Sequence, residues 1–476
     1  MTDETYLIKT APQFDVHKWS DYAEINLVVD ALFEEIKTLR ASKSIRIRGA
    51  DKVKRQLKVI LIDLWAASKL SANPYRAVSL NKTDYGNETR YKKIFLKYDY
   101  FAQVVKDLKE LKYISLKLGF RNPEEPNKSR RTRIKATPKL IDKIINPDYG
   151  VDALVANKGS MALADYNPDL TRETIILRDK DTSGKKYNID YVDTESTNAM
   201  RLNVLKINNK LANDRIALHV TDTQYAAMLR ELSSKKNKNP TVDFTRNSVY
   251  RVFNNASFEQ GGRFYGAWWI GIPKEYRKYI TIGRKPTVEL DYSGHHFRIL
   301  YSLDGLPPPD DPYDIVGFDR EKQKRASLIM INAFDEADAT NAMKGEGISG
   351  AKKLIDAIKA RHSQISHHFF TGVGNNLMYQ DSNLAEKVML RMIDRRATIL
   401  SLHDSFIVRN SYGNELEEIM NEEFENQFGS LTMLKYKKTE GEERSETQTQ
   451  ALGDLSDYDF EQETLSYSYY YSTWGY

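Results

Sequence analysis

Apolar side chains recur at helical spacing in three stretches near the start of the chain. Residues 27–39 and 54–68 each form an amphipathic pattern, and residues 101–111 place their apolar side chains on a single face. Residues 1–25 show no clear period, so we expect an irregular lead-in there. These patterns predict a helical N-terminal domain over residues 1–145.

The third predicted helix runs into two short β-rich segments, 113–118 and 130–135, separated by a turn region with Gly119 and Pro123. This pattern predicts a hairpin. A helix followed by a basic hairpin resembles a winged helix-turn-helix domain, in which the helix enters the major groove of DNA and the hairpin contacts phosphates. A small helical domain with a solvated basic loop is the alternative. The phosphate contacts would come from Arg130, Arg131, Arg133 and Lys135.

Residues 146–244 combine a predicted hairpin with two predicted helices. β-rich runs within 174–191 flank a glycine-containing turn. Helices are expected at 196–211 and from Thr221 onward, before a basic, turn-rich linker at 233–240. The two helices would either grip a duplex as a thumb or pack against the domain that follows. We therefore treat 146–244 as a connecting and thumb-like region.

A strand-to-helix junction carries the most informative carboxylate of the chain. Residues 287–290 have strand character, and a helical pattern runs from Ser293 to Leu303. Asp291 falls between them. A carboxylate at such a junction is supported by a sheet but open to solvent, which suits a metal ligand. The structural alternative is a helix N-cap.

Two further stretches supply matching chemistry. Residues 398–408 form two β-rich runs around His403-Asp404, which predicts a hairpin with a carboxylate at its turn. Between the two carboxylates, residues 319–332 predict a helix that Asp319 would cap. One face of that helix carries, at four-residue spacing, Arg320, Lys324, Leu328 and Asn332.

Carboxylates and cations in this order are the groups that nucleotidyl transfer needs. Two carboxylates brought together can bind a pair of Mg²⁺ ions, and cations on a facing helix can neutralise a triphosphate.

These stretches resemble the motifs of two polymerase families over residues 245–430. Asp291-Tyr-Ser-x-x-x-x-Arg298 is similar to the first palm motif of family A DNA polymerases, Arg320-x-x-x-Lys324 to the start of their fingers helix, and His403-Asp404 to their third motif. His403-Asp404-Ser405-Phe406 and Lys324-Arg325 also resemble the phage-type single-subunit RNA polymerases. Gly262-Arg263-Phe264-Tyr265 is similar to a Gly-Arg element with which both families contact template or primer.

The resemblance implies an α+β fold: a right-hand polymerase palm with reduced fingers at 245–439, a helical thumb-like region before it and a winged-helix-like domain at the N-terminus. It implies that Asp291 and Asp404, with the main-chain carbonyl of Tyr292, bind two Mg²⁺ ions. The implied catalytic cations are Arg320 and Lys324. The implied nucleotide contacts are Tyr292, His296, Arg320, Lys324 and Asn332, and the implied nucleic-acid contacts are Arg263, Arg298 and His403.

The chain also departs from these families. Only 113 residues separate Asp291 from Asp404, so the fingers must be small. The fingers helix lacks the families' aromatic residues, and His296 stands where the DNA polymerases carry a glutamate. These changes affect nucleotide choice and fidelity rather than the metal site.

Composition is consistent with a globular protein that binds a polyanion. The 476 residues suggest about three domains. The formal net charge is +5, but residues 440–463 contain nine carboxylates and one arginine, so the rest of the chain carries +13. The absence of cysteine fits a reducing cytoplasm, and the start of the chain lacks the features of a secretory signal. No apolar run approaches the roughly 20 residues of a membrane span.

Two other segments attract attention for their composition. Residues 440–476 are rich in Glu, Ser, Thr and Tyr, which predicts a disordered acidic tail. His362, His367 and His368 lie close in sequence, but no acidic or thiol partner stands at ligand spacing, so we do not expect a metal site there.

The prediction is a template-directed nucleotidyltransferase: a monomeric, cytoplasmic DNA polymerase of the family A type that acts in DNA replication. No segment is long enough for a proofreading exonuclease. Its partners would be a DNA template and primer with dNTPs, and no membrane. An RNA polymerase or primase using rNTPs is one alternative. A non-catalytic DNA-binding replication initiator is another, although a binding protein has no need to keep two adjacent buried charges.

Overall fold

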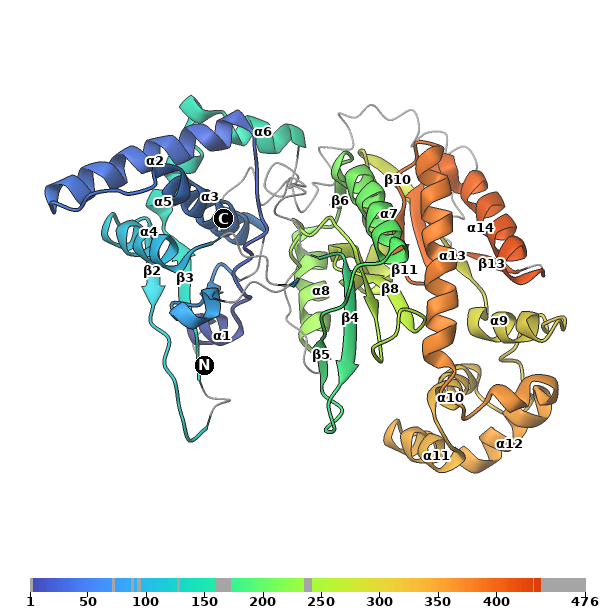
Figure 1. The fold of residues 1–476 in the computed structure, drawn as a ribbon. Coiled ribbons are helices and arrows are strands. Elements are labelled where there is room, and N and C mark those ends of the chain that lie inside the picture. The colour runs from blue at the N-terminus through green and yellow to red at the C-terminus, as the bar shows by residue number, and fades with distance from the viewer. Residues whose placement is uncertain are drawn as a thin grey trace.

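In the computed structural model, two hydrophobic cores organise the chain (Figure 1). The structure describes residues 3–70, 73–86, 90–91, 96–125, 129–158, 173–234, 242–430 and 432–437. The first core draws its buried residues from 25–155 and the second from 175–424. The predicted tail, 440–476, lies outside the described residues, as do residues 235–240 of the predicted linker.

Three helices build the first core as the apolar patterns predict. They are α2 (Ala23–Ser42), α3 (Ala50–Leu70) and α4 (Tyr98–Glu110), and their apolar stripes are buried against one another. The expected irregular start is wrong in part, because α1 (Asp3–Thr10) is helical. Tertiary contacts stabilise it: the side chains of Asn73 and Arg133 donate to the carbonyls of Leu7 and Ile8.

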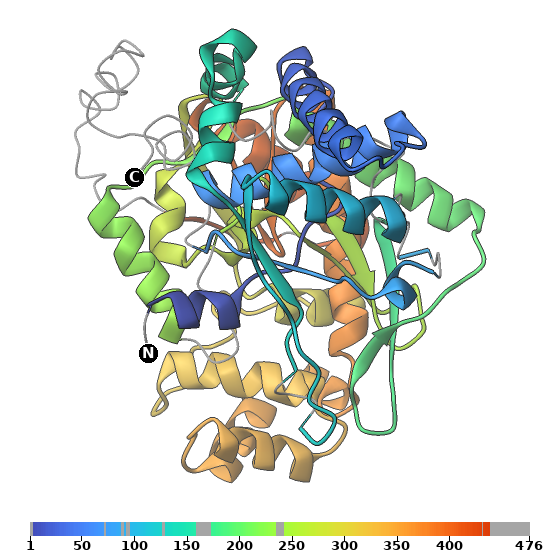
Figure 2. The same ribbon diagram turned by 90° about the vertical axis from the view of Figure 1, so that its left-hand side faces the viewer.

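The predicted helix and hairpin are present after α3. Helix α4 leads into β2 (Ile114–Lys117), which pairs antiparallel with β3 (Thr132–Ala136), and β1 (Arg76–Val78) pairs with the other edge of β3. Figure 2, in which this part faces the viewer, shows the hairpin extending away from the helices. The part closes with α5 (Pro138–Ile144) and α6 (Val151–Lys158).

Two sheets lie in the second core. The strands of the larger sheet run in the order β11-β12-β10-β9-β6, with β13 also paired to β10. The smaller sheet has the order β5-β4-β7-β8, in which only β4 and β7 are parallel. The bounds are β4 (Ile175–Lys180), β5 (Lys186–Asn188), β6 (Ile216–Leu218), β7 (Tyr250–Phe253), β8 (Gly261–Tyr265), β9 (Ile280–Ile282), β10 (Lys285–Tyr292), β11 (Leu400–Leu402), β12 (Ser405–Arg409) and β13 (Leu434–Lys437). The described chain is thus a mixture of helices and mainly antiparallel sheets, in agreement with the α+β class.

Helices cover these sheets and form a separate lobe. Helix α7 (Glu195–Ala212) packs against α13 (Gly374–Asp394), and α14 (Gly413–Phe428) lies on the other side of α13 (Figure 1). Helix α8 (Asp222–Ser234) also joins the second core. The region 146–244 is therefore divided between the two cores. The lobe consists of α10 (Arg320–Asn332), α11 (Glu336–Gly345) and α12 (Ala351–Arg361), and α9 (His295–Leu303) lies between it and the larger sheet (Figure 1).

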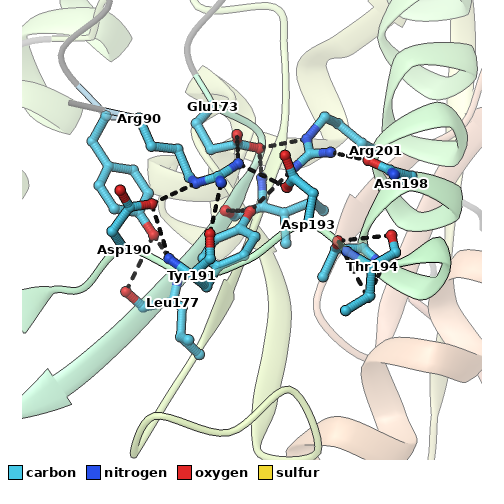
Figure 3. Close-up of polar contacts among 12 residues, drawn as sticks. Arg90, Glu173, Leu177, Asp190, Tyr191, Asp193, Thr194, Asn198 and Arg201 are labelled. Atoms are coloured by element: carbon cyan, nitrogen blue, oxygen red, sulfur yellow. Dashed lines mark hydrogen bonds and ion pairs between the residues drawn. The ribbon is translucent and has the colours of Figure 1, made fainter. Parts of the chain in front are cut away.

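A charged cluster connects Arg90 to the second core (Figure 3). The guanidinium of Arg90 contacts the carboxylates of Asp190, Asp193 and Glu173 at 2.9, 2.8 and 3.3 Å. Its central carbon also lies 4.0 Å from the centre of the Tyr191 ring. A second link is buried: Lys18 lies 2.8 Å from Asp63 of α3 and 3.0 Å from Asp243. We call Arg90 and its partners Glu173, Asp190, Tyr191 and Asp193 the Arg90 cluster.

Candidate active site

Strand pairing brings the two predicted carboxylates together. Central strand β10 pairs with β12 on one edge, where Asp291 lies opposite Ser405, and with β13 on the other. The next residue toward the turn is Asp404, whose carbonyl accepts the Tyr292 N–H at 3.2 Å. The predicted strand, helix and hairpin are all confirmed, and the pairing of β10 with β12 positions Asp291 and Asp404.

Alternation along the strands decides which side chains face the core. Leu290 and Phe406 lie opposite each other and are fully buried on the core face. Asp291 and Glu289 therefore share the other face, where the Ser405 hydroxyl donates to Glu289 at 3.0 Å. At the turn, His403 has a φ of 67°, in the left-handed region that a non-glycine residue adopts only at some cost. Tight reversal of the hairpin thus places Asp404 beside Asp291.

A cleft of about 1160 Å³ opens over these carboxylates. It is lined from several elements: β8, the end of β10, the start of α9, one face of α10 and the β11–β12 turn. Eight of the predicted site residues line it: Arg263, Asp291, Tyr292, His296, Arg320, Lys324, His403 and Asp404.

The start of α9 needs a glycine to reach this position. Gly294 has a φ of +62°, and a Cβ there would lie 2.6 Å from the ring of Pro312. His295 and His296 follow it directly, in the first turn of the helix. A larger residue at 294 would displace this turn, and both histidines with it.

Helix α10 forms as predicted and presents cations to the cleft. The Asp319 side chain caps it by accepting the Lys322 N–H at 2.9 Å. Arg320 donates to Asp311 at 2.8 Å, a hydrogen bond that raises the pKa of Arg320. Lys324 is exposed one turn later and lines the same cleft.

Two site residues predicted for the polymerase-like region lie away from the cleft lining. Arg298 is buried, and it donates to the carbonyls of Ser293 at 2.7 Å and Asp310 at 2.8 Å. It therefore stabilises the turn after Asp291 without lining the cleft. Asn332 donates to the Leu328 carbonyl at 2.7 Å at the end of α10, where it approaches Gly374.

A buried carboxylate that the sequence prediction missed organises one wall of the cleft. Asp381 of α13 accepts from Arg263 of β8, with Nη2 and Nε at 2.7 and 2.8 Å from the same oxygen. Its other oxygen lies 3.2 Å from His295 Nε2. Arg263 is 118 residues away in sequence. The sequence does contain a signal for this carboxylate. Leu377, Asp381, Leu384 and Val388 recur at helical spacing, so Asp381 falls on the apolar, buried face of a predicted helix.

The charges of this wall follow from its burial and its pairing. Burial alone would raise the pKa of Asp381, but Arg263 and His295 outweigh it and hold the pKa below its usual range. Burial and the Arg263 charge lower the pKa of His296 to about 4, and the same two causes lower the pKa of His403. At neutral pH Arg263 and Asp381 therefore form an ionised pair, and the imidazoles of His296 and His403 are neutral.

The tautomer of His296 follows from its contact with Arg263. A guanidinium can only donate, so the 3.2 Å contact from Arg263 Nη2 makes His296 Nε2 an acceptor. The ring proton then sits on Nδ1, a buried atom for which no described residue provides a hydrogen-bond partner. His296 thus has a buried N–H donor without a hydrogen-bond partner among the described residues.

The basic residues of the β2–β3 hairpin differ in their availability. Arg131 is exposed and donates to Gln13 at 2.9 Å, and Arg130 donates to the Leu118 carbonyl at 3.2 Å. Lys135 is partly exposed, 4.8 Å from the ring of Tyr75. Arg133 is buried, and its guanidinium donates to the carbonyls of Ile8 and Arg131. Arg133 therefore stabilises the domain in this arrangement and does not face solvent as the other three do.

No protein-family model matches this chain, and no curated protein matches it. Among the described residues, no helix has both the length and the apolar character to cross a membrane.

Proposed function

We propose that this chain is a template-directed nucleotidyltransferase, a DNA polymerase with a palm built on β10 and the β11–β12 hairpin. One observation carries the proposal: the register of β10 with β12 places Asp291 beside the Asp404 turn, in a cleft that the cations Arg320 and Lys324 of α10 also line. Carboxylates on rigid strands facing a cationic helix are the arrangement that phosphoryl transfer requires.

The donor set of this pair fits Mg²⁺. Asp291 and Asp404 are partly exposed and line the cleft, so their oxygens are accessible to a hard cation. With the adjoining carbonyl of Tyr292 they would hold two Mg²⁺ ions. When bound, these ions would lower the pKa of a primer 3′-hydroxyl and stabilise charge on the phosphates.

The side chains around the pair have separate tasks. Lys324 and Arg320 would bind the triphosphate, and Lys324 is the more available because Arg320 is paired with Asp311. Arg263, held by Asp381, would contact template or primer at the cleft wall. Arg298 would keep the turn after Asp291 in place.

The N-terminal part supports DNA as the polymer. Helix α4 is followed by the β2–β3 hairpin of a three-stranded sheet with the order β1-β3-β2, and this sequence of elements resembles a winged helix. In this role α4 would enter the major groove and Arg130, Arg131 and Lys135 would contact phosphates.

Primer extension tests the proposal. The full chain is given a primed DNA template and Mg²⁺, with dNTPs and rNTPs in separate reactions. Asp404→Asn removes one charge from the site and keeps the side-chain shape, so we expect at least a hundredfold loss of incorporation with an unchanged melting temperature. Asp314→Asn, an exposed aspartate in the loop before α10, is the matched control and should keep full activity.

The results separate the proposal from its rivals. Incorporation of dNTPs that Asp404→Asn abolishes supports a DNA polymerase. Incorporation of rNTPs alone indicates an RNA polymerase or primase with the same site. DNA binding without any incorporation indicates a replication initiator, and full activity in Asp404→Asn overturns the assignment of the two carboxylates.

A further inference from the structure

Outside the cleft, three side chains with metal-binding atoms converge on one point. Asp304 is the residue that ends α9, and His367 and His368 end the short helix η7 (Ser363–His368). Nε2 of His368 lies 3.0 Å from one Asp304 oxygen, and Nε2 of His367 lies 3.4 Å from the other. None of the three lines the cleft over Asp291 and Asp404.

The convergence is close enough for a single ion. One ligand atom from each residue can be chosen so that all three lie within 4.8 Å of one another. The two imidazole rings are 4.1 Å apart, centroid to centroid. In addition, Oδ2 of Asp304 is a buried atom that accepts no hydrogen bond from the described residues. A buried carboxylate oxygen without a donor is costly unless something else satisfies it.

We propose that Asp304, His367 and His368 bind a divalent transition-metal ion, for which Zn²⁺ is the best fit. Imidazole nitrogens favour Zn²⁺ and its neighbours over Mg²⁺ or Ca²⁺, which prefer oxygen ligands. Two imidazoles and a carboxylate are three protein ligands, which leave one coordination position open to water. No acidic partner stands at ligand spacing from the histidines in the sequence, and the fold supplies one from 63 residues upstream of His367.

The third nearby histidine takes no part in this site. His362 is fully buried, with Nδ1 3.0 Å from the Tyr301 hydroxyl and Nε2 2.8 Å from the Pro312 carbonyl. Its ring stacks on Phe297 with centroids 4.2 Å apart. Both ring nitrogens are therefore already used, and the site is limited to the three converging residues.

The position of the site suggests what the ion would do. Asp304 ends the helix that follows Asp291, and two residues after His368 the Phe370 N–H donates to the Met330 carbonyl of α10 at 2.9 Å. An ion at this point would connect α9 to the base of the α10–α12 lobe. Because it binds the folded chain, it would also stabilise that connection.

Zinc binding to the full chain tests the proposal. Calorimetric titration with Zn²⁺ in excess Mg²⁺, which competes for the cleft carboxylates, should show one site per chain. Losing a ligand should weaken binding at least as much as losing an outer-shell partner, about 10–100-fold. We expect this loss in Asp304→Asn, His367→Gln and His368→Gln. His17→Gln, which removes an imidazole from the N-terminal part, should bind Zn²⁺ like the unaltered chain.

Controls keep the outcome decisive. Melting curves recorded without metal show whether each variant folds, and Co²⁺ offered in place of Zn²⁺ gives a visible spectrum that reports imidazole coordination. Absence of binding, or binding of equal strength in all four variants, overturns the site. Because the readout is binding and not nucleotide incorporation, the result does not depend on the proposed function.

Discussion

The guanidinium of Arg263 lies 2.7 Å from the carboxylate of Asp381, in an ion pair that joins strand β8 to helix α13. The same guanidinium contacts His296. Burial by itself would lower the pKa of Arg263, but the charges of Asp381 and Asp404 raise it. Asp381 therefore fixes the direction of a cation that faces the candidate site. A helix outside the polymerase-like motifs thus sets the geometry of one of them.

Removing Asp381 should cost stability. Asp381→Asn leaves Arg263 partly buried without its counter-charge, and breaking a buried pair from one side typically costs about 3–5 kcal/mol. Urea unfolding measures this change. The control, Asp394→Asn, breaks the exposed pair with Lys206 at the end of the same helix and should cost about 1 kcal/mol or less. Equal effects in the two variants would show that the buried pair has no special role.

The Arg90 cluster should hold the N-terminal part against the second core. Arg90→Ala removes contacts to three carboxylates, so we expect faster amide exchange in 173–193 while α13 stays protected. Hydrogen exchange followed by mass spectrometry measures both. Lys186→Ala, which removes an exposed cation from strand β5, is the matched control. Unchanged exchange in Arg90→Ala would mean that other contacts, such as Lys18 with Asp63, are sufficient.

Local patterns were enough to predict the elements that carry the two carboxylates, because each element is specified by its own residues, whereas the family resemblance implied that the carboxylates meet. The strand before Asp291, the hairpin turn at His403-Asp404 and the Asp319 cap are all short-range features. Their meeting needed only one strand register.

Contacts between distant segments were beyond such patterns. The partner of Arg263 lies 118 residues away, and the carboxylate that the histidines at 367 and 368 meet ends another helix. Helix α1 also depends on tertiary contacts, which a periodicity search cannot detect. The basic hairpin was recognised, but burial of Arg133 by that helix could not be read from composition.

Stability should depend on pH through His362. Burial lowers the pKa of His362 to about 4, whereas an unfolded imidazole titrates near 6.5. Between these values the unfolded chain binds the extra proton, so stability present above about pH 6.5 is lost as the pH falls toward 4. His362→Gln should lower stability at pH 7 and reduce this slope, with His296 still contributing. Urea unfolding at several pH values measures it, and an unaltered slope would contradict the neutral buried ring.

The hairpin arginines should separate into two groups in DNA binding. If Arg130, Arg131 and Lys135 contact phosphates, replacing all three with alanine should flatten the slope of log K against log salt by roughly 0.9 per lost contact. Arg133→Ala should instead lower the melting temperature, because it removes hydrogen bonds to the carbonyls of Ile8 in α1 and of Arg131. Titrations of a duplex at several salt concentrations measure the slope. A slope that the triple variant leaves unchanged would mean a solvated loop.

The last prediction concerns the sugar of the incoming nucleotide. From the family resemblance, His296 should lie beside its ribose, where a bulky side chain excludes a 2′-hydroxyl. The structure adds a competing effect, since the buried Nδ1–H of His296 has no partner among the described residues and would donate to a 2′-hydroxyl oxygen if the ring turned toward the cleft. A hydrogen bond of this kind contributes about 0.5–1.5 kcal/mol, and a steric clash can cost more. We therefore expect a preference for dNTPs.

Two substitutions at this position separate bulk from hydrogen bonding. His296→Phe keeps a ring of similar size but removes the N–H, and His296→Ala removes both. If bulk decides, Phe retains the dNTP preference of the unaltered chain and Ala admits rNTPs, as measured by the ratio of incorporation rates on one primed template. If the unaltered chain prefers rNTPs and Phe loses that preference, the Nδ1–H recognises the hydroxyl. Arg263→Lys tests the tautomer itself. A lysine that does not reach Nε2 of His296 no longer fixes that atom as an acceptor, so the ring proton can move between the two nitrogens. If His296 recognises the 2′-hydroxyl, this variant should discriminate less between rNTPs and dNTPs.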